Sequence, residues 1–149
     1  MVELVGNGVQ SLNLNQAATL YTSIPCTKGY VFHEDGTGIV ILRGITPNCF
    51  ARYQINYSGN IALPEGATAG PIAVALSVNG ETRISSRAIF TPAAAEQYGN
   101  VSGTAIITVP RGCCFSVALR SVSGVTDPAG TPAAVINLLD PNVTINRIA

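Results

Sequence analysis

The sequence predicts an all-β fold: a single antiparallel sandwich of about eight to ten strands. Three observations predict it. Short apolar runs are separated by Gly, Pro and Asn along all 149 residues. Several runs alternate apolar and polar residues, as strands with one buried face do. A sustained helical period is missing, and only residues 93–98 after Pro92 are expected to form a single helical turn.

The strands are expected in a regular series along the chain. In the longest run Cys49, Ala51, Tyr53, Ile55 and Tyr57 share one face. Both Asn79-Gly80 and Asp35-Gly36 are turn pairs, and the first should join two neighbouring antiparallel strands. The expected strands are residues 17–24, 29–34, 38–43, 49–63, 71–79, 82–91, 103–109, 113–122, 133–138 and 142–148.

Two adjacent cysteines lie in the stretch "PRGCCFSVALRS". Because successive strand residues point to opposite faces, Cys113 is expected on the core side with Phe115 and Val117. Cys114 is expected on the outer side, together with Ser116, Ala118 and Arg120. The strand pattern also disfavours a disulfide between adjacent cysteines, because that bond needs a strained local turn.

Charged residues are scarce. Only 11% of the chain is Asp, Glu, Lys or Arg, and the formal net charge is zero. A typical soluble domain carries about 25%. The balanced charge predicts neither nucleic-acid nor membrane partners. The shortage itself favours a surface largely covered by other copies, since charged residues are depleted at interface centres.

Small neutral residues on the outer strand faces also favour a surface covered by other copies, since they let another sheet approach closely. The arginines are expected in solvated or interface ion pairs rather than in a ligand site, and the guanidinium fork is enriched at interfaces. The predicted interface residues are Ala73, Ala75, Arg83, Arg87, Cys114, Ser116, Ala118 and Arg120.

Residues 1–16 are expected to form an N-terminal docking arm, and residues 17–149 the sandwich. The arm would attach by main-chain pairing through Val2, Leu4, Val5 and Leu12. It lacks the basic start and apolar run of a secretory signal peptide.

The strand order is typical of a jelly roll. The stretch "YQINYSGNIAL … GPIAVALSVNGE … SSRAIFTP … GTAIITVPRGCCFSVAL … NVTINRIA" resembles the jelly roll of the tumour-necrosis-factor and complement globular-head superfamily. That resemblance covers about residues 20–149 and implies a homotrimer with the last strand near a threefold axis. The stretch "PCTKGYVFHEDGTGIVILRGITPNCFARYQINYSGNIALP" also resembles small proteins of Gram-positive bacteria and their phages.

Residues able to carry chemistry are few. Cys26, Cys49, Cys113 and Cys114 leave three alternatives open: buried structural thiols, which are favoured, one or two disulfides, or a metal site. The only histidine, His33, precedes Glu34 and Asp35; it fits a polar turn better than a metal ligand or a catalytic partner of a thiol. A serine nucleophile elbow is missing. We therefore expect no enzyme activity and no cofactor.

The predicted function is a structural one. The sequence favours a trimeric capsid-decoration protein, or another virion component, at the surface of a phage or phage-like particle. Its partners would be its own copies and a capsid or tail protein. The alternative is a trimeric receptor-binding or adhesion head. It would present loops such as 123–133 to a host glycan or protein.

Overall fold

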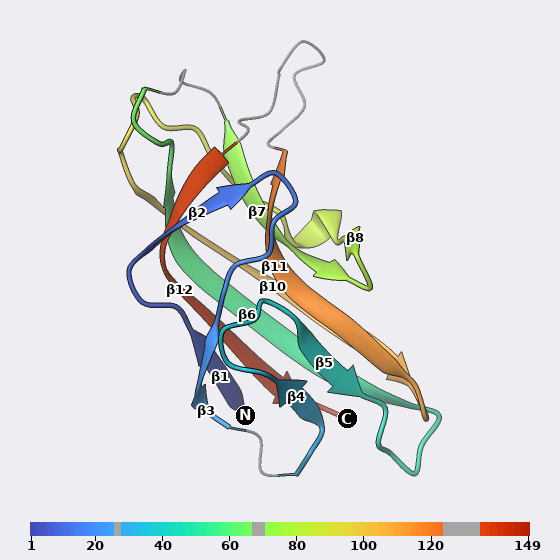
Figure 1. Cartoon of the computed structure of the whole chain (residues 1–149). Coiled ribbons are helices and arrows are strands. Elements are labelled where there is room, and N and C mark those ends of the chain that lie inside the picture. The colour runs from blue at the N-terminus through green and yellow to red at the C-terminus, as the bar shows by residue number, and fades with distance from the viewer. Residues whose placement is uncertain (26–27, 67–70, 124–134) are drawn as a thin grey trace.

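The computed structural model describes residues 1–25, 28–66, 71–123 and 135–149. Two antiparallel sheets pack face to face (Figure 1), which confirms the predicted all-β jelly-roll sandwich. No helix in the described part of the chain is long and apolar enough to cross a bilayer. The loop 123–133, assigned above to receptor contact, lies almost wholly outside the described residues.

The first sheet has the strand order β10-β6-β12-β1-β3, and β2 also pairs with β12. Its longest strands are β6 and β12, which pair over nine residue positions with an irregularity between Leu139 and Asn142. There Asp140 adopts a positive φ of 48°. The strands of this sheet are β1 (Val2–Val5), β2 (Val9–Asn13), β3 (Tyr21–Ile24), β6 (Phe50–Ala62), β10 (Gly99–Pro110) and β12 (Val135–Arg147).

The second sheet has the order β4-β5-β11-β7-β8, and β9 also pairs with β7. The predicted Asn79-Gly80 turn joins β7 to β8, and both residues have positive φ. The expected strand 82–91 is interrupted by a short 3₁₀ helix, η1 (Ile84–Ser86). The strands of this sheet are β4 (Val31–His33), β5 (Val40–Arg43), β7 (Ile72–Val78), β8 (Glu81–Thr82), β9 (Ala88–Phe90) and β11 (Cys114–Ser123).

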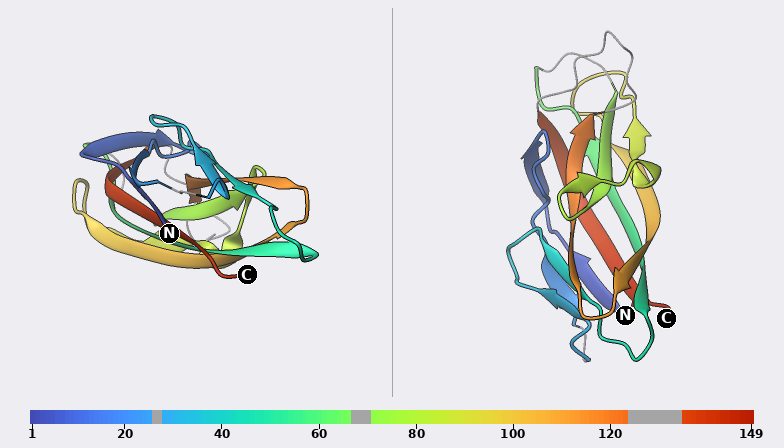
Figure 2. Two further views of the ribbon diagram at one scale, coloured as in Figure 1. Left: turned by 90° about the horizontal axis from the view of Figure 1, so that it is seen from below. Right: turned by 90° about the vertical axis from the view of Figure 1, so that its right-hand side faces the viewer.

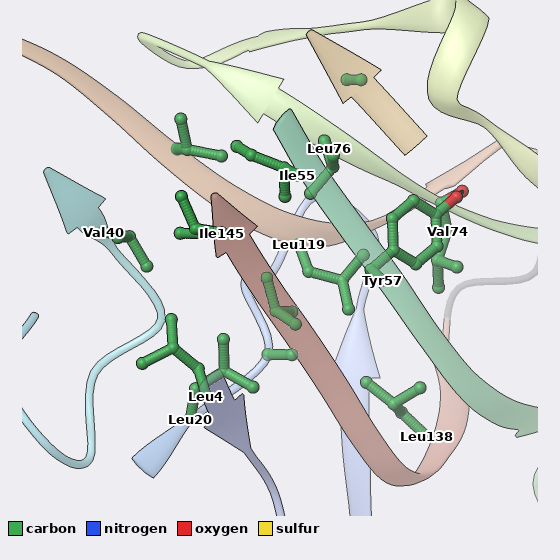
Figure 3. Close-up of a cluster of buried hydrophobic side chains, with 14 of the residues drawn as sticks. Leu4, Leu20, Val40, Ile55, Tyr57, Val74, Leu76, Leu119, Leu138 and Ile145 are labelled. Carbon is green, nitrogen blue, oxygen red and sulfur yellow. Dashed lines mark hydrogen bonds between the residues drawn. The ribbon is translucent and has the colours of Figure 1, made fainter. Parts of the chain in front are cut away.

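The core lies between the two sheets (Figure 3). The first sheet contributes the predicted alternate residues Ala51, Tyr53, Ile55 and Tyr57 of β6, all buried. Val74, Leu76 and Leu119 of the second sheet also belong to this buried cluster. At about 25 cal/mol per Å² of apolar surface, this burial is the main stabilising contribution to the fold.

Two tyrosines of β6 tie the sheets together by hydrogen bonds as well as by packing. The hydroxyl of Tyr53 donates to the carbonyl oxygen of Arg43 at 2.5 Å, and lies 3.2 Å from that of Tyr30. The hydroxyl of Tyr57 donates to the carbonyl oxygen of Ser86 and lies 3.3 Å from that of Val74. Burial raises the pKa of Tyr57 to about 12.

The N-terminal residues belong to the sandwich, so the prediction of a docking arm over 1–16 is wrong. β1 pairs with both β12 and β3, and β2 pairs with β12. Val2, Leu4 and Leu12 lie in the core, while Val5 is half-buried. Apolar burial and main-chain pairing are thus both satisfied within the chain itself.

The expected helical turn at residues 93–98 is also wrong. The structure has bends and a turn there, with Glu96 at a positive φ of 61°. The amide of Glu96 donates to the carbonyl oxygen of Leu63 at 2.9 Å, which draws the chain away from a helical path.

Candidate functional site

An uncharged surface covers the middle of the side of the first sheet that faces away from the core, bordered by Arg52 on β6 and Glu3 on β1. It is formed by alternate residues of three neighbouring strands, whose other residues point inward. We call it the neutral face: Gln54, Asn56, Ser58, Asn60, Asn100, Ser102, Thr104, Ile106, Asn142, Thr144 and Asn146. None of these residues is ionisable.

Strand register sets these side chains in rows across the sheet. One row runs from Asn142 to Ser58 to Ser102, and the next from Thr144 to Asn56 to Thr104. Glu3 of β1 pairs with Thr144 and marks the margin of the face. Small side chains in the middle rows leave a shallow hollow of about 410 Å³. The neutral face therefore presents the hydroxyl and amide groups of short, uncharged side chains.

The neutral face ends at a long unpaired edge. β10 pairs only with β6, over twelve residues, and in the described structure its other side has no strand partner. By contrast, β3, β4, β8 and β9 are each at most four residues long. The guanidinium Nη2 of Arg83 covers one edge carbonyl, that of Ile106, at 2.8 Å. Short or charged edges protect sheets from association; β10 is long, and none of its own side chains is charged.

Several predicted interface residues lie elsewhere, on the second sheet. Ala73, Ala75 and Ala118 are buried within the protomer, at 0%, 0% and 4% exposure. They cannot meet another copy, so the prediction is wrong for these three. The alternation in "IAVALSV" was correct, but both sides of β7 are covered, and alternation cannot reveal this.

The other predicted interface residues are partly or fully accessible, and several of them form hydrogen bonds within the protomer. Arg120 donates to the Ser77 hydroxyl and to the carbonyl oxygen of Asn15, both at 2.8 Å. The amide of Ser116 donates to the Asn79 side chain at 2.9 Å. Arg87 is half-buried, and Cys114 is exposed. These residues stay candidates for contact with a partner.

His33 lies in the polar turn that the sequence predicted. Its Nε2 donates to the carbonyl oxygen of Thr37 at 2.9 Å, and its Nδ1 lies 3.1 Å from the Thr22 hydroxyl oxygen. The amide and side chain of Thr22, followed by His33, lower the pKa of the Asp35 carboxyl. Within the described residues, no three His, Cys, Asp or Glu side chains converge as a metal site would require.

The described cysteines are free and exposed, so the preference for buried thiols is wrong for Cys49, Cys113 and Cys114. Cys113 lies in the turn before β11, where Gly112 has a φ of 77°. The turn removes Cys113 from the inward alternation that begins at Phe115. Cys26 lies outside the described residues. The three thiols are at the other end of the β4–β5 hairpin from His33, since Cys114 pairs with Arg43 and His33 with Val40.

Sequence reasoning missed the neutral face as the candidate site. The signal was present in "ARYQINYSGN", whose polar half is Arg52, Gln54, Asn56 and Ser58. What could not be read from the sequence is that β10 and β12 flank this strand with matching uncharged rows.

Comparisons with solved structures find the same fold. The Eiger TNF structure from S. frugiperda matches with a TM-score of 0.65 and 12% identity, over 99% of this chain and 91% of that chain. The globular domain of zebrafish complement 1qA matches with a TM-score of 0.54 and 14% identity, over 96% and 94%. Murine APRIL at pH 5.0 matches with a TM-score of 0.56 and 12% identity, over 96% and 98%.

Sequence comparisons add nothing to this. No protein-family model matches the chain, and no curated protein matches it significantly. At these low identities the structural likeness establishes the fold alone: a jelly roll like those of the tumour-necrosis-factor and complement globular-head proteins.

Proposed function

We propose that this chain is a non-enzymatic structural subunit that assembles as a homotrimer by covering its neutral face with sister copies. The observation that carries the proposal is the neutral face itself, eleven outward positions on three strands without one ionisable side chain. A solvated surface is normally about 25–35% charged. An uncharged face of this extent is typical of an interface between subunits.

The edge of β10, which has no strand partner in the described structure, supports a cyclic assembly. The neutral face and the β10 edge are two different unpartnered features of one protomer. A head-to-tail contact in which the edge of one copy meets the face of the next satisfies both features in every copy. Contacts of this heterologous kind close into rings, of which a trimer is one. The fold resemblance implies the same copy number.

The test is the molar mass of the chain in solution, measured by light scattering. The proposal expects three times the 15.4 kDa of one chain. A lysine introduced by Thr104→Lys or Asn56→Lys should dissociate the trimer, because each copy would bury an unpaired charge. Asn7→Lys, on an exposed loop residue outside the face, is the matched control. A wild-type monomer at high concentration would overturn the proposal.

We further propose that the trimer is a virion component, held at the particle surface by a capsid or tail protein. Support comes from the resemblance of residues 25–64 to small proteins of Gram-positive bacteria and their phages. Immunogold labelling of particles with an antibody against the chain tests this role. Label spread over the particle shell supports decoration, and label confined to fibre tips would instead assign the receptor-binding role. Unlabelled particles would refute both.

A further inference from the structure

One end of the sandwich gathers loops from several strands. Figure 2 (right) shows the β5–β6 and β10–β11 connections beside both chain termini at the lower end. The amide of Gly44 donates to the carbonyl oxygen of Cys113 at 2.8 Å, and the amide of Arg111 to that of Cys49 at 2.9 Å. The amide of Arg52 donates to the carbonyl oxygen of Ala149 at 3.1 Å. We call this region, residues 28–30, 43–52, 110–114 and 147–149, the basic end.

The positive charge of the molecule is concentrated there. Five of the eight basic residues lie in these segments, and none of the eight acidic residues does. The zero net charge, which predicted no attraction to a membrane, therefore conceals an uneven distribution. The five basic residues are Lys28, Arg43, Arg52, Arg111 and Arg147.

Three of these arginines lie over aromatic rings: Phe50 and Tyr30 of the basic end, and Phe32 of the adjoining strand β4. The guanidinium of Arg52 lies 4.7 Å from the Phe50 ring centre. That of Arg147 lies 4.0 Å from the Tyr30 ring, and that of Arg43 lies 5.9 Å from the Phe32 ring. Stacking fixes the guanidinium plane and can leave its N–H edge for an oxyanion. The Nε of Arg147 donates to the Ala149 carbonyl oxygen at 3.1 Å. Arg43 and Arg52, as well as Lys28 and Arg111, are exposed to solvent.

Large apolar side chains are exposed beside these charges. Ile45 is 49% exposed, Ile148 48% and Phe50 37%. Phe50 and Arg111 also line a hollow of about 560 Å³ together with Pro47, Asn48 and Cys49. Exposed apolar side chains gathered at one end of a molecule mark an interaction surface.

We propose that the basic end binds the surface of an anionic lipid bilayer. The arginines and Lys28 attract phosphate headgroups, and Ile45, Phe50 and Ile148 enter the boundary between headgroups and acyl chains. The pairing of charge with exposed apolar residues favours a bilayer over a soluble polyanion, which would satisfy the arginines but leave the isoleucines in water. This inference is independent of the trimer and of the virion role.

The test is cosedimentation of the full chain with vesicles. We expect binding to vesicles containing about one-third phosphatidylglycerol, weak binding to pure phosphatidylcholine, and release as salt shortens the Debye length from about 10 Å to about 3 Å. Arg52→Gln and Arg111→Gln should each lower the partition coefficient about fivefold. Ile45→Ser should lower it by a similar factor.

Matched controls use residues far from the basic end. Arg87→Gln removes the same charge, and Ile89→Ser replaces an isoleucine that is 38% exposed on β9. Both should bind vesicles like the wild type, and circular dichroism should show every variant folded. The same proteins are then tested with soluble polyphosphate.

Three outcomes would overturn the proposal. The first is a wild-type chain that stays in the supernatant with phosphatidylglycerol vesicles at low salt. The second is a loss of binding in the control variants equal to that of Arg52→Gln. The third is polyphosphate binding as tight as vesicle binding, with Ile45→Ser unchanged in both, which would assign the basic end to a soluble polyanion.

Discussion

The packing of Tyr57 against Gly103 gives the sharpest prediction for stability. A Cβ added at Gly103 would lie 2.6–2.7 Å from three atoms of the Tyr57 side chain, about 1 Å inside normal contact. The ring cannot retreat, because its hydroxyl donates to the carbonyl oxygen of Ser86. Overpacking of this kind costs about 1–3 kcal/mol. Replacing a strand glycine by alanine lowers the conformational entropy of the unfolded chain, which stabilises the folded state by only about 0.5–1 kcal/mol.

Gly103→Ala should therefore destabilise the protein by about 1–2 kcal/mol, which corresponds to about 2–8 °C in Tm for a domain of this size. Urea unfolding followed by circular dichroism measures it. Because Gly103 does not have a positive φ, the loss comes from the contact and not from the backbone.

A double variant separates these causes. Tyr57→Val removes the ring, so Gly103→Ala should be nearly neutral in that background, with a coupling of at least about 1 kcal/mol. Ser102→Ala, the outward neighbour on β10, is the control. A Gly103→Ala variant as stable as the wild type would refute the contact. Equal losses in both backgrounds would refute the mechanism.

Three further predictions concern other buried or exposed groups. Ser86→Ala should cost about 1–3 kcal/mol in urea unfolding, since the buried hydroxyl accepts a β7 amide at 3.0 Å and donates to a carbonyl oxygen at 2.7 Å; a neutral effect would mean that these bonds are absent. The pKa of Tyr57 rises in the folded state from 10.0 to about 12, so its contribution to stability is complete below pH 10 and is lost between about pH 10 and 12. Tyr57→Phe should lack that part of the alkaline decline, and identical pH profiles would contradict the assignment. Native protein should react with a thiol reagent at Cys49, Cys113 and Cys114 without denaturant, and mass spectrometry showing any of them unmodified would contradict their exposure.

Much of the fold could be predicted because local patterns agree with the final structure. The alternation around Tyr53 and Tyr57 identified the inward face of β6, and Asn79-Gly80 identified a hairpin. The N-terminal strands were missed because their partners are distant in sequence. Leu4 faces Val143 across β1 and β12, and a pairing of such separation leaves no local signal.

The candidate site was harder to predict than the fold. An alternating strand shows which residues share a face, but it does not show which face stays open. Ala73 and Ala75 were assigned to an open face and are buried, whereas Asn56 and Ser58 line the surface that is open in one protomer. Cys113 was misplaced by a single residue, because the turn at Gly112 ends one residue later than the alternation implied.

The hydroxyls of Tyr53 and Tyr57, four residues apart on β6, form hydrogen bonds that link the two sheets at two points. Two anchoring points on one strand oppose both sliding and rotation of the sheets, in addition to the apolar packing. The first sheet, whose strands β6 and β10 carry Asn56 and Thr104, is therefore rigid. Any adjustment of shape in the described structure on contact with another molecule would have to come from outside these strands, and amide exchange along β6 should stay slow.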